Sequence, residues 1–456
     1  MNFSIRLCFL IVITAFLCSN CEQDDENQFP DIPDDNFWIM LIMQGVDTNG
    51  DRKISRDEAE AVDSLNLSYG YYYYDGGDIE LIIKDLEGIE AFVNLEVLIC
   101  TSQQLTELDV SKNTMLKHLN CSHNLLSRLD LTENTLLNQL YCSGNHLNHL
   151  DLSNTPALGD LDCRYNQIEV LDLSNLLGLR SLYCSNNELT GLDISANYLL
   201  EILDCSGNNV RELDIANHQR LEWLICATCN LVELELSALQ DLEYLNCNNN
   251  YFSQLDLSGL TKLTGLECNH NLLEELNLED NTTLEFIACS NNDLSQLDLS
   301  GLNQLTGLDC SVNELSQLDL SDLTNLSWLY CVTNQLTEII FPENPEIWSL
   351  NCAENQLSSL DVSGFAKLYE LFCHDNQLTS LNVSNGILNY MYCGGNLLTS
   401  LDITQNAGTL YYLSCTNMPG LVEVCVWMLP FPPEHITIDD TGSPNIVYTT
   451  ECSLIP

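Results

Sequence analysis

The sequence contains few basic residues. Lysine and arginine together number 14 among 456 residues, against 66 aspartates and glutamates, which gives a formal net charge of −52 at pH 7. Nucleic acids and anionic membrane surfaces would repel a chain of this charge. The composition therefore excludes nucleic acid as a partner and favours basic partners and Ca²⁺.

The sequence also lacks the residue patterns of a catalytic centre. It has neither a serine nucleophile elbow nor a glycine-rich phosphate loop, and its 8 histidines are scattered. His146 and His149 share one segment, but no third ligand accompanies them, which favours a surface loop over a metal site. The C-x-x-C spacing of Cys226 and Cys229 does not make a zinc motif, because no second pair accompanies it within the repeats. We therefore predict that the protein is not an enzyme.

Long apolar runs are missing after the N-terminus. Arg6 precedes the run Leu7–Leu17, which is too short to cross a bilayer, so residues 1–20 are predicted to be a signal peptide. Cleavage before Cys21 would resemble lipoprotein processing, and the acidic segment after it resembles a surface-export tag. We expect a lipid on Cys21 and an outer-membrane, cell-surface location. Asn20 and Cys18 depart from the lipoprotein motif, so an ordinary signal peptide with secretion is the alternative.

What the sequence does contain is a regular repeat with one cysteine in each unit. The segments 203–216 (LDCSGNNVRELDIA) and 308–321 (LDCSVNELSQLDLS) show the shared pattern. A fixed period of this length indicates a solenoid, in which each repeat, here called a rung, stacks on the next. Sixteen cysteines follow this pattern, and the first fourteen are spaced 21 residues apart. They are Cys100, Cys121, Cys142, Cys163, Cys184, Cys205, Cys226, Cys247, Cys268, Cys289, Cys310, Cys331, Cys352, Cys373, Cys393 and Cys415.

The pattern resembles the leucine-rich repeat, with cysteine where leucine more often ends the strand. In x-L-x-C-x, the leucine and the cysteine point inward and the x residues outward. Sixteen rungs in register would build a parallel sheet roughly 75 Å long. The LDLS half is too short for a helix and predicts a second extended segment on the opposite, convex side. We therefore predict a β-rich solenoid with a concave parallel sheet and little helix.

Two polar columns and the cysteines have structural interpretations. Asparagine follows the cysteine by three residues in thirteen of the sixteen rungs, where its amide can satisfy buried backbone groups of the turn. The recurring aspartate, from Asp109 to Asp402, is interpreted as a turn residue rather than a weak cation site. Parallel Cβ vectors disfavour disulfides between neighbouring rungs, so these cysteines are predicted to be buried and free. Cys425 and Cys452 lie outside the repeat, where a disulfide would close a cap.

Residues 47–58 (DTNGDRKISRDE) resemble an EF-hand calcium loop that follows an apolar helix at Phe37–Val46. Arg52 departs from the pattern, which requires glycine there for a left-handed turn. The alternative is an acidic helix-turn-helix that binds no metal. The resemblance implies one structural Ca²⁺ with the ligands Asp47, Asn49, Asp51, Lys53 through its carbonyl, Ser55 and Glu58.

These features divide the chain into six segments. We predict a signal peptide at 1–20, an acidic tether at 21–36 and the EF-hand-like helix-loop-helix at 37–66. A connector at 67–95 contains a tyrosine-rich surface loop and a first rung that lacks the cysteine. The solenoid spans 96–420 and a C-terminal cap spans 421–456. We expect a monomer whose membrane contact is limited to the lipid anchor.

The concave face is the expected binding surface, because exposed aromatic side chains on a rigid sheet are typical interface anchors. We predict a surface-anchored recognition protein for a protein or peptide partner. Aromatic rows also stack on sugars, so a glycan-binding accessory protein is the alternative, and a hydrated spacer protein is the third. The predicted contact residues are Trp223, Tyr244, Phe286, Trp328, Tyr330, Phe372, Tyr390, Tyr392 and Tyr412.

Overall fold

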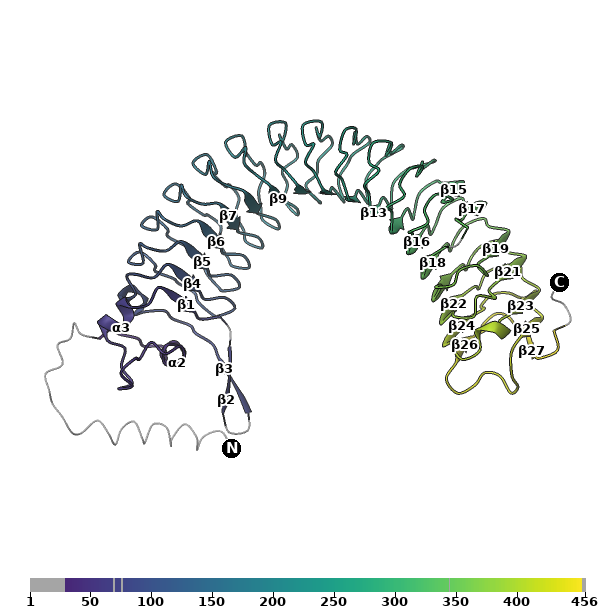
Figure 1. Ribbon diagram of the computed structural model, residues 1–456, viewed down its shortest axis with the longest axis horizontal. Coiled ribbons are helices and arrows are strands. Elements are labelled where there is room, and N and C mark those ends of the chain that lie inside the picture. The colour runs from purple at the N-terminus through teal and green to yellow at the C-terminus, as the bar shows by residue number, and fades with distance from the viewer. Residues whose placement is uncertain (1–28, 69, 75–76, 344, 453–456) are drawn as a thin grey trace. The chain divides into compact units, whose positions relative to one another are not determined.

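The computed structural model describes residues 29–68, 70–74, 77–343 and 345–452 (Figure 1). The chain folds as two compact units that divide after Asn138. Each unit is a stack of short strands with a buried leucine and cysteine interior. Within the described ranges, no helix has the length and apolar character needed to cross a membrane.

The first unit begins with two short helices and a small parallel sheet. The helices are α2 (Asp35–Met43) and α3 (Arg56–Glu60), and a 3₁₀ turn η1 spans Ile89–Ala91. The central leucines of three parallel strands align in register and are buried. The strands of this unit are β1 (Ser64–Asn66), β4 (Val97–Ile99) and β5 (His118–Asn120), together with the antiparallel pair β2 (Gly70–Tyr74) and β3 (Gly77–Leu81).

Helix α2 starts where Asp34 caps it and ends earlier than the sequence indicated. The Asp34 carboxylate accepts the backbone N–H groups of Asn36 and Phe37, which satisfies donors at the helix start. Gly45 adopts a φ of 76°, a left-handed conformation that ends helices. The helix therefore spans Asp35–Met43 rather than Phe37–Val46, with Phe37, Met40 and Leu41 on its buried side.

The second unit is a solenoid whose main sheet is parallel throughout and lies on the inner side of the curve that its rungs follow (Figure 1). Its strands, which we call the inner face, are β6 (Gln139–Tyr141), β7 (Asp160–Asp162), β8 (Ser181–Tyr183), β9 (Ile202–Asp204), β10 (Trp223–Ile225), β11 (Tyr244–Asn246), β12 (Gly265–Glu267), β13 (Phe286–Ala288), β14 (Gly307–Asp309), β16 (Trp328–Tyr330), β18 (Ser349–Asn351), β20 (Glu370–Phe372), β22 (Tyr390–Tyr392), β24 (Tyr412–Ser414) and β26 (Thr437–Asp439).

The opposite side of this unit carries short strands only in its later rungs, while the earlier rungs have turns there. This agrees with the predicted β-rich solenoid, in which the LDLS segment is too short for a helix. A 3₁₀ turn η2 spans Thr404–Asn406. The outer strands are β15 (Gln317–Asp319), β17 (Glu338–Ile340), β19 (Ser359–Asp361), β21 (Ser380–Asn382), β23 (Ser400–Asp402), β25 (Glu423–Cys425) and β27 (Val447–Thr449).

Parallel strands occur both before and after residues 96–420, the segment predicted as the solenoid. Strand β1 pairs with β4 although residues 64–66 were assigned to the helix-loop-helix segment. At the other end, β26 pairs with β24 within the segment predicted as a cap. The segment predicted as a tyrosine-rich loop contains the hairpin β2–β3. The rungs that contain β1 and β26 lack the cysteine, so the repeat pattern did not reveal them.

The asparagine column holds the rungs together from inside. The side-chain amide of Asn166 donates to the carbonyls of Cys142 and Cys163, each at 3.1 Å, and its oxygen accepts the N–H of Leu147 at 3.0 Å. Cys229 replaces asparagine in one rung, and its thiol donates to the Cys205 carbonyl at 3.2 Å. One polar side chain per rung thus satisfies backbone groups that the narrow core would otherwise leave unpaired.

Candidate functional site

All nine predicted aromatic contact residues lie on strands of the inner face, and none is buried. Strand alternation explains this placement, because each ring occupies a position next to an inward-pointing leucine, isoleucine or methionine. Trp223 is the most exposed of them, with 44% of its surface accessible. The rings therefore do not form part of the leucine and cysteine core.

The rings on the earlier strands form two groups. Trp223 and Tyr244 have ring centroids 5.0 Å apart, and the Tyr244 hydroxyl donates to the Glu267 carboxylate. Burial and this carboxylate raise the pKa of Tyr244 well above its usual range. Farther along, Trp328 lies 5.7 Å from Phe286 and 5.0 Å from Tyr330, between ring centroids. These contacts hold the rings in fixed orientations.

Glycine residues allow these rings to lie flat on the sheet. A Cβ placed on Gly265 would lie 2.7 Å from Cδ2 of Tyr244, closer than any real carbon contact. A Cβ placed on Gly307 would likewise clash with the indole of Trp328. The alternation of ring and glycine from Tyr244 to Trp328 therefore produces a shallow aromatic surface rather than protruding side chains.

The later strands carry a larger aromatic cluster. From one strand to the next, Phe372 stacks on Tyr392 with 4.8 Å between ring centroids, and Tyr392 lies tilted against Tyr412 at 4.9 Å. Beside them, Tyr390 makes edge contacts with Tyr369 at 6.0 Å and with Tyr411 at 5.9 Å. Stacking over successive strands restrains the side chains, so little conformational entropy would be lost on binding.

Three exposed rings at the edge of this cluster were not among the predicted contact residues. Trp348, Tyr369 and Tyr411 each stand one residue before an inner strand and are 42%, 44% and 52% exposed. All predicted contact residues lie within the x-L-x-C strand, whereas these three precede it. The repeat spacing could have revealed them, because Trp348 and Tyr369 are 21 residues apart, as are Tyr390 and Tyr411.

The predicted calcium loop has a tightly wound backbone. The side chains of Asp47, Asn49 and Asp51 accept the N–H groups of Gly50, Asp51 and Lys53 at 2.7 to 2.8 Å. Arg52 adopts a φ of 66°, the left-handed conformation for which the EF-hand pattern uses glycine. The loop therefore adopts, at Arg52, the left-handed turn that the EF-hand pattern places at this position.

Glu58 is held by hydrogen bonds on both carboxylate oxygens. Oε1 accepts from the backbone and hydroxyl of Thr48 at 2.8 and 2.9 Å, and Oε2 accepts from the backbone and hydroxyl of Ser55 at 2.9 and 2.8 Å. The bond from the Ser55 backbone is the largest of the effects that lower the pKa of Glu58 to about 2. Glu58 is therefore ionised at neutral pH, as a metal ligand must be.

The fit of these residues to Ca²⁺ is partial. The ligand types and the backbone turns suit a hard cation that prefers oxygen. In the part of the chain that the structure describes, however, no three acidic, histidine or cysteine side chains converge closely enough to hold a metal ion. Calcium binding would require Glu58 to exchange its bonds with Thr48 and Ser55 for the ion.

The aspartate column forms turns on the side away from the inner face. In each of these rungs, Oδ1 accepts the backbone N–H of the residue two positions later, as in Asp256 to Ser258 and Asp298 to Ser300. These bonds lower the pKa of both exposed carboxylates. This geometry is the one expected of turn residues.

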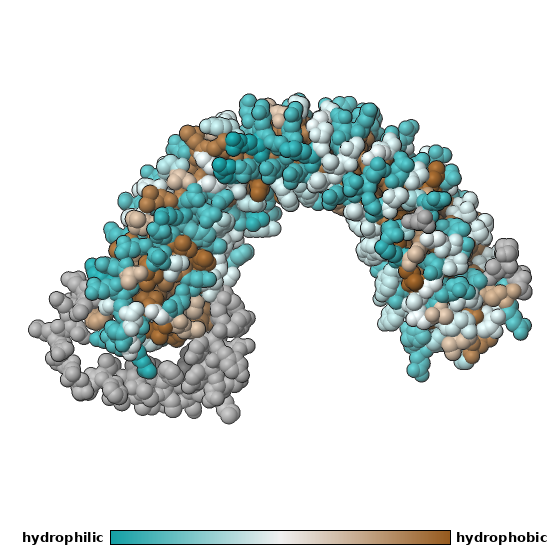
Figure 2. Space-filling model, in the orientation of Figure 1, coloured by the Kyte–Doolittle hydropathy of each residue, from teal (hydrophilic) through white to brown (hydrophobic). Residues whose placement is uncertain are grey.

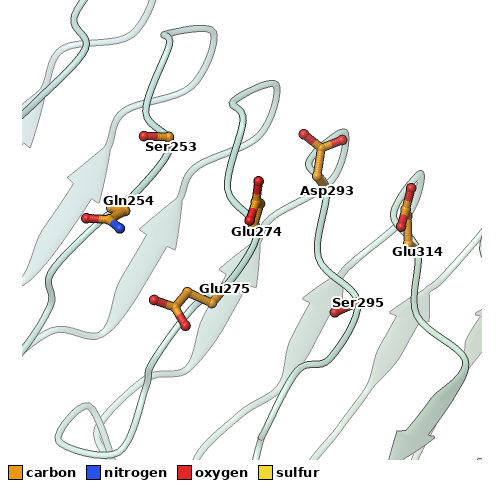
Figure 3. A pocket seen from close by; sticks show the side chains of 7 residues that line it. All are labelled: Ser253, Gln254, Glu274, Glu275, Asp293, Ser295 and Glu314. Atoms are coloured by element: carbon orange, nitrogen blue, oxygen red, sulfur yellow. The ribbon is translucent and has the colours of Figure 1, made fainter.

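An acidic hollow of about 580 Å³ opens on the second unit between successive rungs (Figure 3). Its lining includes Glu274, Glu275, Asp293 and Glu314, together with Ser253, Gln254 and Ser295. The carboxylates come from neighbouring rungs and are spread along the surface rather than aimed at one point (Figure 3). The surface seen in Figure 2 is mostly hydrophilic over this unit, with scattered hydrophobic residues.

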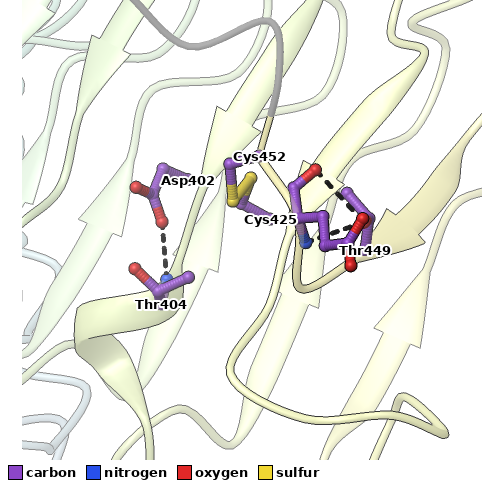
Figure 4. Close-up of a disulfide and its surroundings, with 6 residues drawn as sticks. Asp402, Thr404, Cys425, Thr449 and Cys452 are labelled. Carbon is purple, nitrogen blue, oxygen red and sulfur yellow. Dashed lines mark hydrogen bonds between the residues drawn. A yellow bond between two sulfur atoms is a disulfide. The ribbon is translucent and has the colours of Figure 1, made fainter.

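The cysteines separate into two chemical groups. Seventeen are free and buried within the described residues, and burial raises the pKa of Cys121 and Cys163 to about 12. Cys425 at the end of β25 is joined to Cys452 by a disulfide, with 5.7 Å between their α carbons (Figure 4). This crosslink lies beside the turn in which Asp402 accepts the N–H of Thr404 (Figure 4). The predicted lipidation site Cys21 and the signal peptide lie outside the described residues.

Comparison with known proteins gives structural matches. No family model matches the chain, and no curated protein is significantly similar to it in sequence. The functional domain of InlJ from Listeria monocytogenes, which includes a cysteine ladder, is 30% identical, and the match covers 86% of this chain and 75% of that one with a TM-score of 0.62.

Two further structures share the fold at lower identity. A leucine-rich repeat protein from Leptospira interrogans is 20% identical over 84% of this chain and 97% of its own, with a TM-score of 0.64. The leucine-rich repeat ectodomain of a membrane receptor kinase from Arabidopsis thaliana, solved in complex with Casparian strip integrity factor 2, is also 20% identical. That match covers 79% of this chain and 54% of the other, with a TM-score of 0.63.

Proposed function

The chain belongs to the leucine-rich repeat family, and we propose that it is a non-enzymatic recognition protein that binds a protein or peptide partner on its inner face. The observation that carries this proposal is the set of mutually contacting, partly exposed aromatic rings on successive inner strands. Partly exposed rings that are already fixed in place can bury a large apolar area at small entropic cost.

The fold and the structural relatives support the same class of function. Leucine-rich repeat proteins generally mediate interactions between proteins, and the Arabidopsis ectodomain was solved in complex with Casparian strip integrity factor 2. The sequence offers no nucleophile with a base and no phosphate-binding loop. The rigid sheet instead presents side chains from many rungs to one large partner.

The proposed location is the cell surface. The N-terminal sequence supports a signal peptide followed by a lipid on Cys21 and an acidic tether, with secretion as the alternative. The similarity to InlJ and to a receptor ectodomain supports extracellular exposure. A disulfide between Cys425 and Cys452 fits an oxidising compartment.

We further propose that residues 47–58 bind one structural Ca²⁺. Asp47, Asn49, Asp51, Ser55 and Glu58 would supply side-chain oxygens and Lys53 its carbonyl. The ionised state of Glu58 and the turns of the loop support this assignment. The ion would fix the segment that joins α2 to α3 and would take no part in recognition.

The proposed binding surface can be tested by double substitution. Proteins captured from the natural milieu by the full chain are compared with those captured by Trp328→Ala/Tyr392→Ala. Truncation of a hot-spot aromatic costs about 2 kcal/mol or more, so affinity should fall at least about tenfold. The melting temperature should remain nearly unchanged, because these rings lie outside the core. Full binding by the double variant would contradict the proposal.

Glycan binding is the second candidate, and the flat rings over Gly265 and Gly307 favour it. A shallow aromatic surface suits the apolar faces of sugar rings as well as peptide side chains. A glycan array probed with the full chain and the same double variant separates the candidates. Ring-dependent glycan binding without a captured protein would replace the leading proposal.

A further inference from the structure

The second unit contains an internal example of a cation bound on its inner face. Arg164 donates from Nε and a terminal nitrogen to the two oxygens of Asp162, at 2.9 and 2.8 Å. Its guanidinium also lies over the ring of Tyr183, 4.9 Å from the centroid. Asp162 and Tyr183 are register partners on the parallel strands β7 and β8. An aspartate and a tyrosine side by side on adjacent inner strands therefore hold a guanidinium through an ion pair and a cation–π contact.

The same pair of residues recurs on β14 and β16 without an arginine. Asp309 and Tyr330 are register partners, as Asp162 and Tyr183 are. The residue two positions after Asp309 is Ser311, in the place of Arg164. The backbone N–H of Ser311 donates to Oδ1 of Asp309 at 3.0 Å, but its side chain carries no charge and is too short to cover the tyrosine ring. Within the described residues, the Asp309 carboxylate thus has no internal counter-ion of the kind that Asp162 has.

A second aromatic ring makes the later pair better suited to a cation. The indole of Trp328 lies 5.0 Å from the ring of Tyr330, and the two planes meet at 44°. Asp309, Trp328 and Tyr330 are each half-buried. Partial burial strengthens an ion pair relative to one in open water. Tryptophan is also the most favourable ring for a cation.

Charge on the surrounding face points to the same type of ligand. The inner strands carry Asp160, Asp162, Asp204, Glu267, Asp309, Glu370 and Asp439. None of these strands contains a lysine or arginine, and the two arginines nearest to them are already paired, Arg164 with Asp162 and Arg180 with Glu201. A partner that approaches this face meets carboxylates and rings, so a basic segment is the complementary one.

We propose that Asp309, Trp328 and Tyr330 form an anchoring site for an arginine or lysine side chain of a cationic protein partner. The carboxylate binds the charged group, and the two rings contact its face and its aliphatic stem. This inference rests on the proposed function, because it assigns the partner's chemistry at the same inner face. It predicts a preference for arginine, whose planar group matches the internal arrangement at Arg164.

The first test measures binding of a fluorescent Gly-Ser peptide with spaced arginines to the full chain at physiological salt. The same peptide with citrulline in place of arginine keeps the shape and removes the charge. Asp309→Asn keeps an oxygen for the Ser311 N–H and removes the negative charge. We expect it to weaken the arginine peptide about fivefold or more, and the citrulline peptide should bind poorly to both proteins.

The matched control removes the same charge elsewhere. Glu338 is exposed on β17 in the opposite sheet, so Glu338→Gln changes the net charge equally without touching the site. It should alter binding less than twofold. Equal effects of Asp309→Asn and Glu338→Gln would overturn the inference, since only the overall field would then matter. Equal binding of the citrulline and arginine peptides would overturn it as well.

A gain of binding supplies the complementary test. Arg164→Ser removes the internal guanidinium and leaves Asp162 and Tyr183 in the arrangement of Asp309 and Tyr330. The number of arginine peptides bound should rise, and Asp162→Asn in the same background should reverse the increase. Unchanged binding by Arg164→Ser would contradict the inference.

The natural partner distinguishes this inference from the broader proposal. If Trp328→Ala/Tyr392→Ala loses the partner and Asp309→Asn retains it at full affinity, the inner face is the binding surface but the cation site is wrong. If both variants retain the partner, the proposed function itself fails. Loss of the partner in both variants, with melting temperatures unchanged, supports both.

Discussion

The indole of Trp328 lies against the α carbon of Gly307, its register partner on the preceding inner strand. A Cβ at Gly307 would overlap the ring atoms Cζ2, Cε2 and Nε1. The glycine therefore determines the orientation of the ring, and the surface around Trp328 depends on two positions 21 residues apart.

Gly307→Ala should displace the Trp328 ring without unfolding the chain, because the side chain can rotate outward while the backbone stays in place. We expect a changed near-UV circular dichroism spectrum, since the contact with Tyr330 would be lost, together with weaker binding of the partner. Gly191→Ala is the control, since a Cβ there would have no neighbour within 4 Å. Identical spectra for the two variants would show that the ring does not depend on Gly307.

The buried asparagine column should contribute strongly to stability. Asn313 donates to the carbonyls of Cys289 and Cys310 at 3.0 and 3.1 Å and accepts the N–H of Leu294 at 3.0 Å. Asn313→Ala leaves these groups unpaired in the core and should lower the free energy of unfolding by about 1 to 3 kcal/mol. Chemical denaturation measures the change. Asn154→Ala at an exposed position should have little effect, and an equal loss there would refute the assignment.

The repeat pattern predicted the inner face correctly because two physical rules decide it. Alternation along a strand determines that Trp328 and Tyr330 point outward while Leu329 points inward, and constant spacing determines which residues become neighbours. The sequence could not reveal that Arg164 bends back to Asp162, since this depends on a side-chain conformation. The edge rings Trp348, Tyr369 and Tyr411 were missed because they lie one residue outside the predicted strand. The sheet ends at β1 and β26 were missed because those rungs have no cysteine.

The cysteines should differ sharply in reactivity. Mass spectrometry of non-reduced peptides should find Cys425 linked to Cys452, as their α-carbon separation of 5.7 Å allows. The seventeen buried cysteines should react with alkylating agents only after unfolding, because burial keeps them protonated and inaccessible. Crosslinks between cysteines of neighbouring rungs would contradict the packing described here.

Stability should depend on acid through Glu58. Its pKa falls from 4.5 to about 2 in the folded chain, so the ionised form stabilises the fold above pH 4.5. That contribution should disappear as the pH falls from about 4.5 to about 2. Glu58→Gln should therefore lose stability at neutral pH and show a smaller further loss over this range in acid titrations monitored by circular dichroism. Asp57→Asn, at an exposed neighbouring position, should keep the wild-type profile. A Glu58→Gln profile parallel to wild type would exclude this role.

Calcium should raise the melting temperature of the full chain if residues 47–58 bind it, because a ligand that binds only the folded state stabilises that state. Asp51→Asn provides a sharper test than truncation of Glu58, whose hydrogen bonds to Thr48 and Ser55 support the loop without metal. The asparagine oxygen can still accept the Lys53 N–H, while the charge that attracts the cation is removed.

Wild type should melt at a higher temperature in calcium than in chelator, and magnesium should give a smaller shift, since it demands near-ideal octahedral geometry. Asp51→Asn should melt close to the temperature of metal-free wild type in both conditions. Equal melting of wild type in calcium and in chelator would mean that the loop is a hydrogen-bonded helix connection, with Glu58 as its central acceptor.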